Sequence, residues 1–207
     1  MDDSVQRAMA NWPNVPAVYG YIGVDRRGGF WLQGHRVSHQ RTARYIARNY
    51  HLDDQGRAFF QNGPQRTYAD LEATPWVYRI HDHGELRCHT DTPVAALRSA
   101  WLTPDGTVIL TTEHGPGIVH DQDLGLLLDA LSTPDGTEAM DALEALQGGG
   151  SVTVHLSLAA GAVTLGLLPD DHLARQFGFD PRPEPGDDPR AAVSEWRPAW
   201  QPAPEAT

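Results

Sequence analysis

The chain has 207 residues, of which 40% are hydrophobic, and a formal net charge of -11 at pH 7. This length suits one domain or two small lobes that share a core, and the acidic balance argues against a nucleic-acid-binding protein. No apolar run reaches the roughly 18 residues of a membrane-spanning helix, and the N-terminus carries early acids without the apolar segment of a secretory signal. The single cysteine, Cys88, excludes an internal disulfide framework and favours a reducing compartment, so a cytoplasmic protein is expected.

Charge is distributed unevenly along the chain. Residues 1–100 contain 12 arginines and 10 acidic residues, whereas residues 101–207 contain 4 arginines and 17 acidic residues. All 16 basic residues are arginine. Either the base composition of the genome or a need for bidentate recognition of anions explains this usage.

Short strands around one helix are predicted for the first half of the chain. Pro13 and Pro16 keep the leader extended. Apolar alternation between turn residues indicates strands near residues 19–24, 30–33, 58–61, 67–72, 73–80 and 85–89. A helix is predicted from about His39 to Tyr50, with Ser38 as its N-cap.

The second half is predicted to begin with a hairpin and to continue with helices. The strands 94–102 and 108–113 flank the turn Pro104-Asp105-Gly106, and a helix begins near Asp121. A short helix is expected from about Thr137 to Gln147, followed by a hairpin of residues 152–158 and 162–168. The last expected helix ends at Phe177, with Asp170 or Asp171 as its cap.

The two halves repeat one strand-turn-helix pattern with opposite charge. FWLQGHRVSHQRTARYIARN is rich in arginine, and VILTTEHGPGIVHDQDLGLLLDAL is acidic. The matched positions are Gly28 and Gly106, Trp31 and Ile109, Val37 and Val119, Tyr45 and Leu127, and Ile46 and Leu128. Either an ancient duplication or the general likeness of such units accounts for the match. The predicted fold class is α+β, with antiparallel sheet, two main helices and, under duplication, two related lobes.

One compact body is predicted for residues 1–179, with residues 17–91 and 92–179 as candidate lobes. Residues 180–207 hold 7 of the 16 prolines and are predicted to form an extended or disordered tail. Trp196 and Trp200 are unusual in such a tail. They either dock on the body or on a neighbour, or they are exposed to solvent.

Two stretches resemble proteins of unknown function. NWPNVPAVYGYIGVDRRGGFWLQG and FFQNGPQRTYADLEATPWVYRI resemble an uncharacterised proteobacterial family known only as a domain of unknown function, over roughly Asn11 to Leu131. The order DRRGGFWLQGHRV, helix, LDDQGRAFFQ, DLEATPWV is more loosely similar to a second such family, known from structural genomics. The resemblance implies a stand-alone bacterial domain and carries no activity, cofactor or catalytic residue.

The densest group of metal-ligand types lies around a predicted hairpin tip, in HDHGELRCH. Its members are His81, His83, Cys88 and His89. Histidine and cysteine can hold zinc, but Cys88 and His89 should point to opposite faces of their strand. No CxxC or HExxH spacing supports the site. We therefore expect a solvated hairpin tip, no bound metal and no cofactor.

Histidines also flank the starts of both main helices: His35 and His39 before the first, His114 and His120 before the second. Helix N-termini bind anions through free backbone N–H groups. The candidate anion-binding residues are His35, Arg36, His39, Arg41, Arg44 and Arg48. The alternative is a set of surface histidines and a solvated arginine face.

Nucleophile and phosphate-loop motifs are absent from the sequence: there is no G-x-S-x-G and no P-loop. The sequence therefore favours non-enzymatic binding of a protein partner, a second copy of the chain or a small anionic ligand, and it leaves enzymatic activity undecided. The alternative is a metal-dependent or histidine-based hydrolase that uses His81, His83 and His89.

Overall fold

The computed structural model describes residues 1–169, 172–194, 196, 198 and 200. The chain divides into two compact units. The first unit is Met1–Pro75 with Gly178–Thr207, and the second unit is Trp76–Phe177. The division falls inside residues 17–91, which the sequence marked as one candidate lobe.

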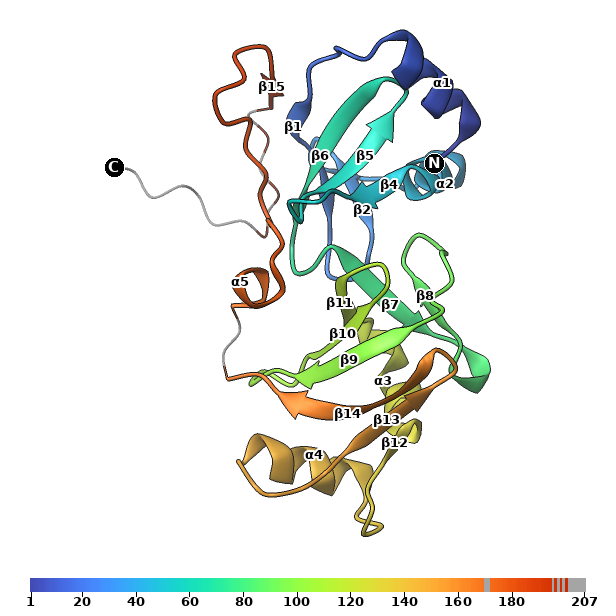
Figure 1. The fold of residues 1–207 in the computed structure, drawn as a ribbon, viewed down its shortest axis with the longest axis vertical. Helices are drawn as coiled ribbons and strands as arrows, with labels where there is room; N and C mark the ends of the chain where they lie inside the picture. The colour runs from blue at the N-terminus through green and yellow to red at the C-terminus, as the bar shows by residue number, and fades with distance from the viewer. Residues whose placement is uncertain (170–171, 195, 197, 199, 201–207) are drawn as a thin grey trace, which may run out of the picture. The chain divides into compact units, whose positions relative to one another are not determined.

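The first unit is built on a seven-stranded sheet (Figure 1). Its order is β3-β2-β1-β6-β5-β4, and β15 pairs with β1. The elements are α1 (Asp3–Asn11), β1 (Val18–Val24), β2 (Phe30–Leu32), β3 (His35–Arg36), α2 (Gln40–Arg48), β4 (Tyr50–Leu52), β5 (Ala58–Asn62), β6 (Gln65–Leu71) and β15 (Ala192–Val193). The core includes Ile22 of β1 and Ile46 of α2, which are both buried.

The second unit holds an eight-stranded sheet of order β12-β13-β14-β9-β10-β11-β7-β8. Its strands are β7 (Trp76–Ile80), β8 (Leu86–Cys88), β9 (Leu97–Leu102), β10 (Val108–Thr112), β11 (Pro116–Val119), β12 (Leu131–Ser132), β13 (His155–Leu158) and β14 (Gly161–Leu167). Its helices are the 3-10 turns η1 (Asp82–Gly84) and η2 (Asp121–Asp123), and α3 (Leu124–Asp129), α4 (Ala139–Gln147) and α5 (Leu173–Phe177). Ile109, Leu110 and Leu156 are buried in its core.

Both units share one topology. Six strands run in the order β3-β2-β1-β6-β5-β4 in the first unit and β11-β10-β9-β14-β13-β12 in the second. In chain order, a helix joins the third strand of each set to the fourth: α2 in one unit and α3 in the other. The central pairs, β1 with β6 and β9 with β14, are both parallel. The repeated pattern seen in the sequence is therefore a repeat of fold.

The predicted α+β class is confirmed, but the sheets are mixed rather than purely antiparallel. Among the described residues, four strand pairs are parallel: β1 with β6, β1 with β15, β7 with β11, and β9 with β14. A parallel pair needs a long crossover connection, which local turn signals do not reveal. The N-terminal leader also contains a helix that was not predicted, α1, which buries Val5.

Histidines cap the helix starts of both units. The Nδ1 atom of His39 accepts a hydrogen bond from Thr42 N (3.4 Å), and the Nδ1 atom of His120 accepts one from Gln122 N (3.1 Å). The first cap is therefore His39 and not Ser38, because an unprotonated ring nitrogen can replace the oxygen of an ordinary cap. The predicted cap of the last helix, Asp170 or Asp171, lies outside the described residues.

Both units also repeat their turn chemistry. In the first unit, the carboxylates of Asp25 and Asp53 each accept a hydrogen bond from the backbone two residues later (2.9 and 3.0 Å). The second unit repeats this bond in the sequence TPDGT, which occurs at residues 103–107 and 133–137. There, the carboxylates of Asp105 and Asp135 accept hydrogen bonds from Thr107 N (3.2 Å) and Thr137 N (3.1 Å). No helix among the described residues is long and apolar enough to cross a membrane.

Candidate functional site

An irregular stretch opens the central strand pair of the first unit. The register between β1 and β6 changes from Val18 opposite Thr67 to Ile22 opposite Ala69. The four-residue advance from Val18 to Ile22 in β1 therefore lies opposite an advance of only two residues in β6, from Thr67 to Ala69. Gly20 lies in this stretch with φ of 68°, a left-handed conformation that glycine adopts without steric cost.

The C-terminal segment crosses this region and is fixed on both sides of it. On one side, Leu71 N donates to Pro181 O (2.8 Å) and Asp180 N donates to Gly56 O (2.9 Å). On the other side, β15 pairs with β1, and Ser194 N donates to Tyr19 O (2.9 Å). Residues 182–190 form the loop between these two anchors.

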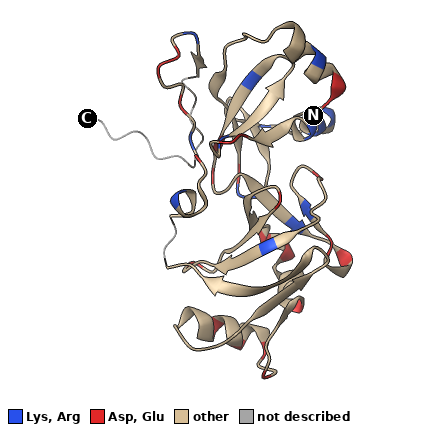
Figure 2. Cartoon of the chain, viewed as in Figure 1, with Lys and Arg blue, Asp and Glu red and all other residues tan. Residues whose placement is uncertain are grey.

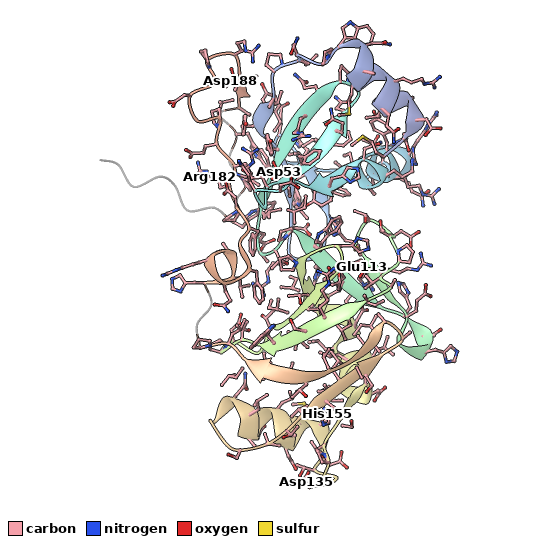
Figure 3. All side chains as sticks on the ribbon, in the orientation of Figure 1. Asp53, Glu113, Asp135, His155, Arg182 and Asp188 are labelled. Carbon is pink, nitrogen blue, oxygen red and sulfur yellow. The ribbon has the colours of Figure 1, made fainter. Side chains whose placement is uncertain are left out.

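Side chains order both ends of that loop. The carboxylate of Asp180 accepts a hydrogen bond from Arg182 N (2.9 Å), and the carboxylate of Asp188 accepts one from Arg190 N (3.0 Å). Figure 3 labels Arg182 and Asp188 on this segment. Aspartates that bind their own backbone in this way define turns, so a turn stands at each end of the loop.

A pocket of about 240 Å³ lies where this loop meets the sheet. Its lining residues are Tyr19, Gly20, Asp70, Arg182, Pro183, Glu184, Pro185 and Val193. Asp70 comes from β6 and is only 2% exposed, whereas Glu184 is exposed and Arg182 is half-buried. The pocket thus presents two acidic side chains and one guanidinium.

An aromatic and charged network supports the wall of the pocket. Tyr19 stacks on Tyr68 with ring centroids 4.9 Å apart. The hydroxyl of Tyr68 accepts from Arg57 Nη2 (2.8 Å) and donates to Asp53 Oδ2 (3.2 Å), and Arg57 Nε donates to the same oxygen (2.9 Å). Burial, followed by the nearby Tyr68, raises the pKa of the Tyr19 hydroxyl, which therefore stays protonated at neutral pH.

Two tryptophans of the C-terminal segment pack on the same unit. A Cβ atom at Gly34 would lie 2.8 Å from Trp196 Nε1, and one at Gly23 would lie 3.1 Å from the ring of Trp200. The rings of Trp31 and Trp200 meet edge to face with centroids 5.7 Å apart. Of the alternatives left by the sequence, the structure shows docking on the body.

The six candidate anion-binding residues do not form one site. His39 is used as the cap of α2, and Arg36 lies 3.9 Å from the carboxylate of Asp25. Arg48 binds Asp2 of the same unit, with Nε 3.0 Å from Oδ1. His35, Arg41 and Arg44 are exposed. What remains of the arginine set is a surface made by Arg41 and Arg44.

The four candidate zinc ligands are spread along the β7–β8 hairpin. His81 and His83 are exposed at its tip, and His83 has φ of 60°. His89 lies beyond the other end of β8, where its Nδ1 accepts from Val77 N (3.2 Å). Burial raises the pKa of the Cys88 thiol to about 12. Residues 1–169, 172–194, 196, 198 and 200 contain no group of three or more histidine, cysteine or acidic side chains arranged to hold a metal ion.

The pocket was not predicted from the sequence, because its residues are far apart in the chain. Tyr19, Asp70 and Arg182 come from β1, β6 and the C-terminal loop. Two signals were available: a glycine inside the apolar strand AVYGYIGV and an aspartate inside the strand TYADLE. Both residue types are depleted in strands, and a glycine there often marks a bulge or a close approach.

A sequence model of the family described as "Protein of unknown function (DUF2946)" matches residues 1–184, and the chain belongs to this family. None of the curated proteins compared with the chain matches it. The expected membership of a family of unknown function is confirmed.

Two crystal structures of DUF1285 family proteins are similar. The protein from Silicibacter pomeroyi DSS-3 has 12% sequence identity and a TM-score of 0.51, with 74% of this chain and 84% of that chain covered. The protein from Shewanella baltica OS155 has 17% identity and a TM-score of 0.42, with 53% of this chain and 91% of that chain covered. The first likeness shows a shared fold.

Proposed function

We propose that this protein is a non-enzymatic binding protein and that it binds a small ligand in the pocket beneath the loop of residues 182–190. The observation that carries the proposal is a buried carboxylate, Asp70, in the same pocket as the guanidinium of Arg182. Small-ligand sites are concave and orient their ligand with a few polar groups. The small anionic ligand expected from the sequence was assigned to residues around α2; in this pocket, an anionic group of the ligand would face Arg182.

The anchors on both sides of the loop favour a loop that is in place before a ligand binds over a loop that closes on the ligand afterwards. A loop that is held in place loses little conformational freedom when a ligand binds, so more of the contact energy appears as affinity. The lining offers charge and one protonated tyrosine hydroxyl. These groups can hold and orient a charged molecule.

A thermal-shift screen of small charged metabolites tests the proposal. A ligand at about one hundred times its dissociation constant stabilises the folded state by about 2.7 kcal/mol, which is a shift of several degrees for a chain of this size. We expect Asp70→Asn and Arg182→Gln to weaken that shift. Asp54→Asn and Arg7→Gln, at exposed positions outside the lining, serve as matched controls and should leave it unchanged. A shift of equal size in all four variants would place the ligand elsewhere.

A protein partner is the second candidate, and a different observation favours it. Arg41 and Arg44 project from α2 and are exposed. Figure 2 shows basic residues on α2 and acidic residues on α4 of the second unit. An exposed basic face, in a chain whose other half is strongly acidic, suits contact with an acidic surface. The hydrolase alternative needs His81, His83 and His89 to converge, and their separation along the hairpin does not favour it.

A further inference from the structure

We propose that the first unit binds an extended, tryptophan-bearing segment of another protein, on a surface that its own C-terminal segment covers when that partner is absent. The surface consists of Gly23, Gly34 and the ring of Trp31, and we call it the indole-binding surface. It uses neither the charged residues that line the pocket nor the arginines of α2. This partner is therefore additional to the ligand proposed above.

Two glycines let aromatic rings lie on the backbone at the indole-binding surface. A Cβ atom at Gly23 would lie 3.1 Å from Cζ2 of Trp200 and 3.3 Å from Cη2 of Trp196. A Cβ atom at Gly34 would lie 2.8 Å from Nε1 of Trp196. Trp31, which pairs with Gly23 across the strands, meets the ring of Trp200 edge to face. A glycine inside a strand often marks a close approach of this kind, so Gly23 is suited to receive a ring.

The repeat of fold identifies the residue of the second unit that corresponds to Gly23. Asp25 and Thr103 begin equivalent turns, because each donates its N–H to the carbonyl four residues later, over 3.0 and 2.9 Å. Gly23 in β1 and Trp101 in β9 each lie two residues before these positions. Each also pairs with the residue eight positions further along the chain. The second unit therefore has a tryptophan where the first unit has a glycine.

Trp101 fills this place from its own strand. A Cβ atom at Gly166 of β14 would lie 2.6 Å from the Trp101 ring, so the ring lies across the neighbouring strand. The Nε1 atom of Trp101 donates to Ser99 Oγ (2.9 Å). In the first unit, the ring of Trp200 reaches Gly23 from a separate segment. The surface of the first unit is thus complete only when a separate segment supplies a ring.

Backbone hydrogen bonds align that segment without reading its sequence. β2 pairs with Ile22–Val24 of β1, which leaves the earlier residues of β1 to pair with β15 (Figure 1). Ala192 N donates to Ala17 O (3.1 Å), and Ser194 N donates to Tyr19 O (2.9 Å). Extended peptides add to the edge of a sheet in this way, with affinity from the backbone and specificity from side chains. A segment of a partner can therefore make the same bonds.

The chain's own segment is an incomplete occupant. The Nε1 atom of Trp200 is buried and has no hydrogen-bond partner within the part of the chain that the structure describes. A buried donor without a partner weakens the contact that buries it, because its hydrogen bond to water is lost. Val193 of β15 is 51% exposed and adds little burial. A partner segment that satisfies its indole N–H at this position binds more tightly and displaces the C-terminal segment.

The indole-binding surface and its occupant differ in their relation to the family. The family model matches residues 1–184, which include Gly23, Trp31 and Gly34 and exclude Trp196 and Trp200. The surface therefore lies in the part of the chain that the family model describes, whereas the two rings do not. A second copy of the chain would bring the same segment with the same buried Nε1 atom, so exchange between copies offers no difference in free energy. The occupant that the surface favours is a segment of another protein.

The C-terminal segment also shows the chemistry of that partner. Trp196 and Trp200 are four positions apart, and the buried Pro198 lies midway between them. Proline favours an extended chain and lowers the conformational entropy that is lost on binding. Tryptophan buries a large area and has a polar N–H that needs an acceptor. The partner segment is therefore extended, with two tryptophans at this spacing and a proline between them.

Fluorescence polarisation with a labelled synthetic peptide of residues 190–202 tests the proposal on the full chain. Trp196→Ala with Trp200→Ala uncovers the surface, and this double variant should bind the peptide at least about tenfold more tightly than the parent, whose own segment competes at a high effective concentration. A peptide with alanine at both tryptophan positions should not bind. Adding Gly23→Leu to the double variant should abolish binding, because the new side chain takes the place of the ring. Adding Gly125→Leu, where nothing lies within 4 Å of a Cβ atom, should leave binding unchanged.

A random peptide library selected against the double variant tests the chemistry of the partner. We expect the enriched sequences to carry tryptophan, with a second tryptophan four positions away and proline between them. Enriched sequences without an aromatic residue would overturn the proposed ligand class.

Two further results decide the proposal. Equal affinity of the parent and the double variant, or no binding to the double variant, overturns it, because the C-terminal segment is then a fixed part of the fold. A dimer of the parent that the double variant loses, measured by light scattering, would place a second copy on the surface and overturn the assignment to another protein. Trp12→Ala, which removes a tryptophan that is 60% exposed, should bind the peptide as the parent does. Should the double variant lose its cooperative melting transition, Trp200→Ala alone carries the test, and affinity equal to that of the parent then overturns the proposal.

Discussion

Asp123 joins the start of a helix to a strand within the second unit. Its carboxylate accepts hydrogen bonds from Arg79 Nε (2.6 Å), Arg79 Nη2 (3.0 Å) and Ile80 N (3.0 Å), and the residue is 5% exposed. Burial raises the pKa of this carboxyl, but the hydrogen bonds from Arg79 and Ile80 outweigh burial and leave the pKa below its usual value. The ionised side chain is therefore part of the folded state.

We expect Asp123→Asn to destabilise the protein by about 2 kcal/mol at neutral pH, because hydrogen bonds to a charged group are replaced by weaker ones. A lowered folded-state pKa contributes stability that is complete above the unfolded value of about 3.9 and is lost as the pH falls through the folded value. The difference between parent and variant should therefore shrink in acid. Urea unfolding at neutral pH and below pH ~3 measures it.

Asp129→Asn is the matched control, since Asp129 is exposed at the end of α3. It should leave the free energy of unfolding nearly unchanged at both pH values. A loss in Asp123→Asn that is the same in acid as at neutral pH would mean that packing, not the ionised carboxylate, supplies the stability.

At the scale of elements, turns and helix starts were predictable from sequence because their signals are local. Glycines after Asp25 and Asp53 marked two turns, and the apolar spacing of α2 identified its buried face. Ile46 and Leu127 are the buried helix residues that correspond, whereas the repeat in the sequence paired Ile46 with Leu128. Counted from the capping histidines His39 and His120, the buried residue comes seven positions later in both units, so the sequence repeat was matched one residue out of register.

Gly56 is the element-scale position where the C-terminal segment depends most on the absence of a side chain. Its φ is 73°, and a Cβ atom there would lie 2.1 Å from Gly178 O. We expect Gly56→Ala to lower the free energy of unfolding by more than roughly 1–2 kcal/mol, which is the cost of a left-handed conformation at a non-glycine residue. The added methyl group should also push the C-terminal segment away from its anchor at Asp180. Limited proteolysis should then cleave residues 178–194 faster, and tryptophan fluorescence should shift to the red.

Gly63→Ala is a close control for this prediction. Gly63 has φ of 57°, also left-handed, but nothing lies within 4 Å of the position that a Cβ atom would take. The free energy of unfolding of Gly63→Ala should fall only by the cost of the left-handed conformation. The C-terminal segment of this variant should stay protected from proteolysis. Equal cleavage of the two variants would show that the contact at Gly178 does not hold the C-terminal segment. In the parent protein, early cleavage inside residues 30–131 would contradict the predicted compact body.

At the scale of the whole molecule, the sequence predicted the repeat and the charge split but not the pocket. Local periodicity could match the two strand-turn-helix units, and composition could reveal the charges. Neither could show that Asp70 and Arg182 line one pocket, since that depends on a parallel strand pair and on a C-terminal segment interpreted as a tail. The proline content of that segment indicated an extended chain but carried no information about the backbone hydrogen bonds that fix it.

The last prediction concerns the arginine face of α2. We expect Arg41→Glu with Arg44→Glu to weaken contact with a second copy, whose residues 101–207 carry 17 acidic residues and 4 arginines. Exposed pairs contribute only about 0–1 kcal/mol each and are screened by salt, so assembly should change more than the melting temperature. Light scattering coupled to gel filtration, at low and high salt, measures the change in mass.

Two comparisons make this test specific to α2. Arg48→Glu breaks an ion pair with Asp2 inside the same unit, so it should act on stability rather than on assembly. Arg7→Glu with Arg98→Glu reverses two exposed arginines on other elements and changes the net charge equally. If both double variants keep the parent's assembly mass and salt response, Arg41 and Arg44 form a solvated face. If only the α2 variant loses mass, α2 is the contact surface, because the two double variants carry the same total charge.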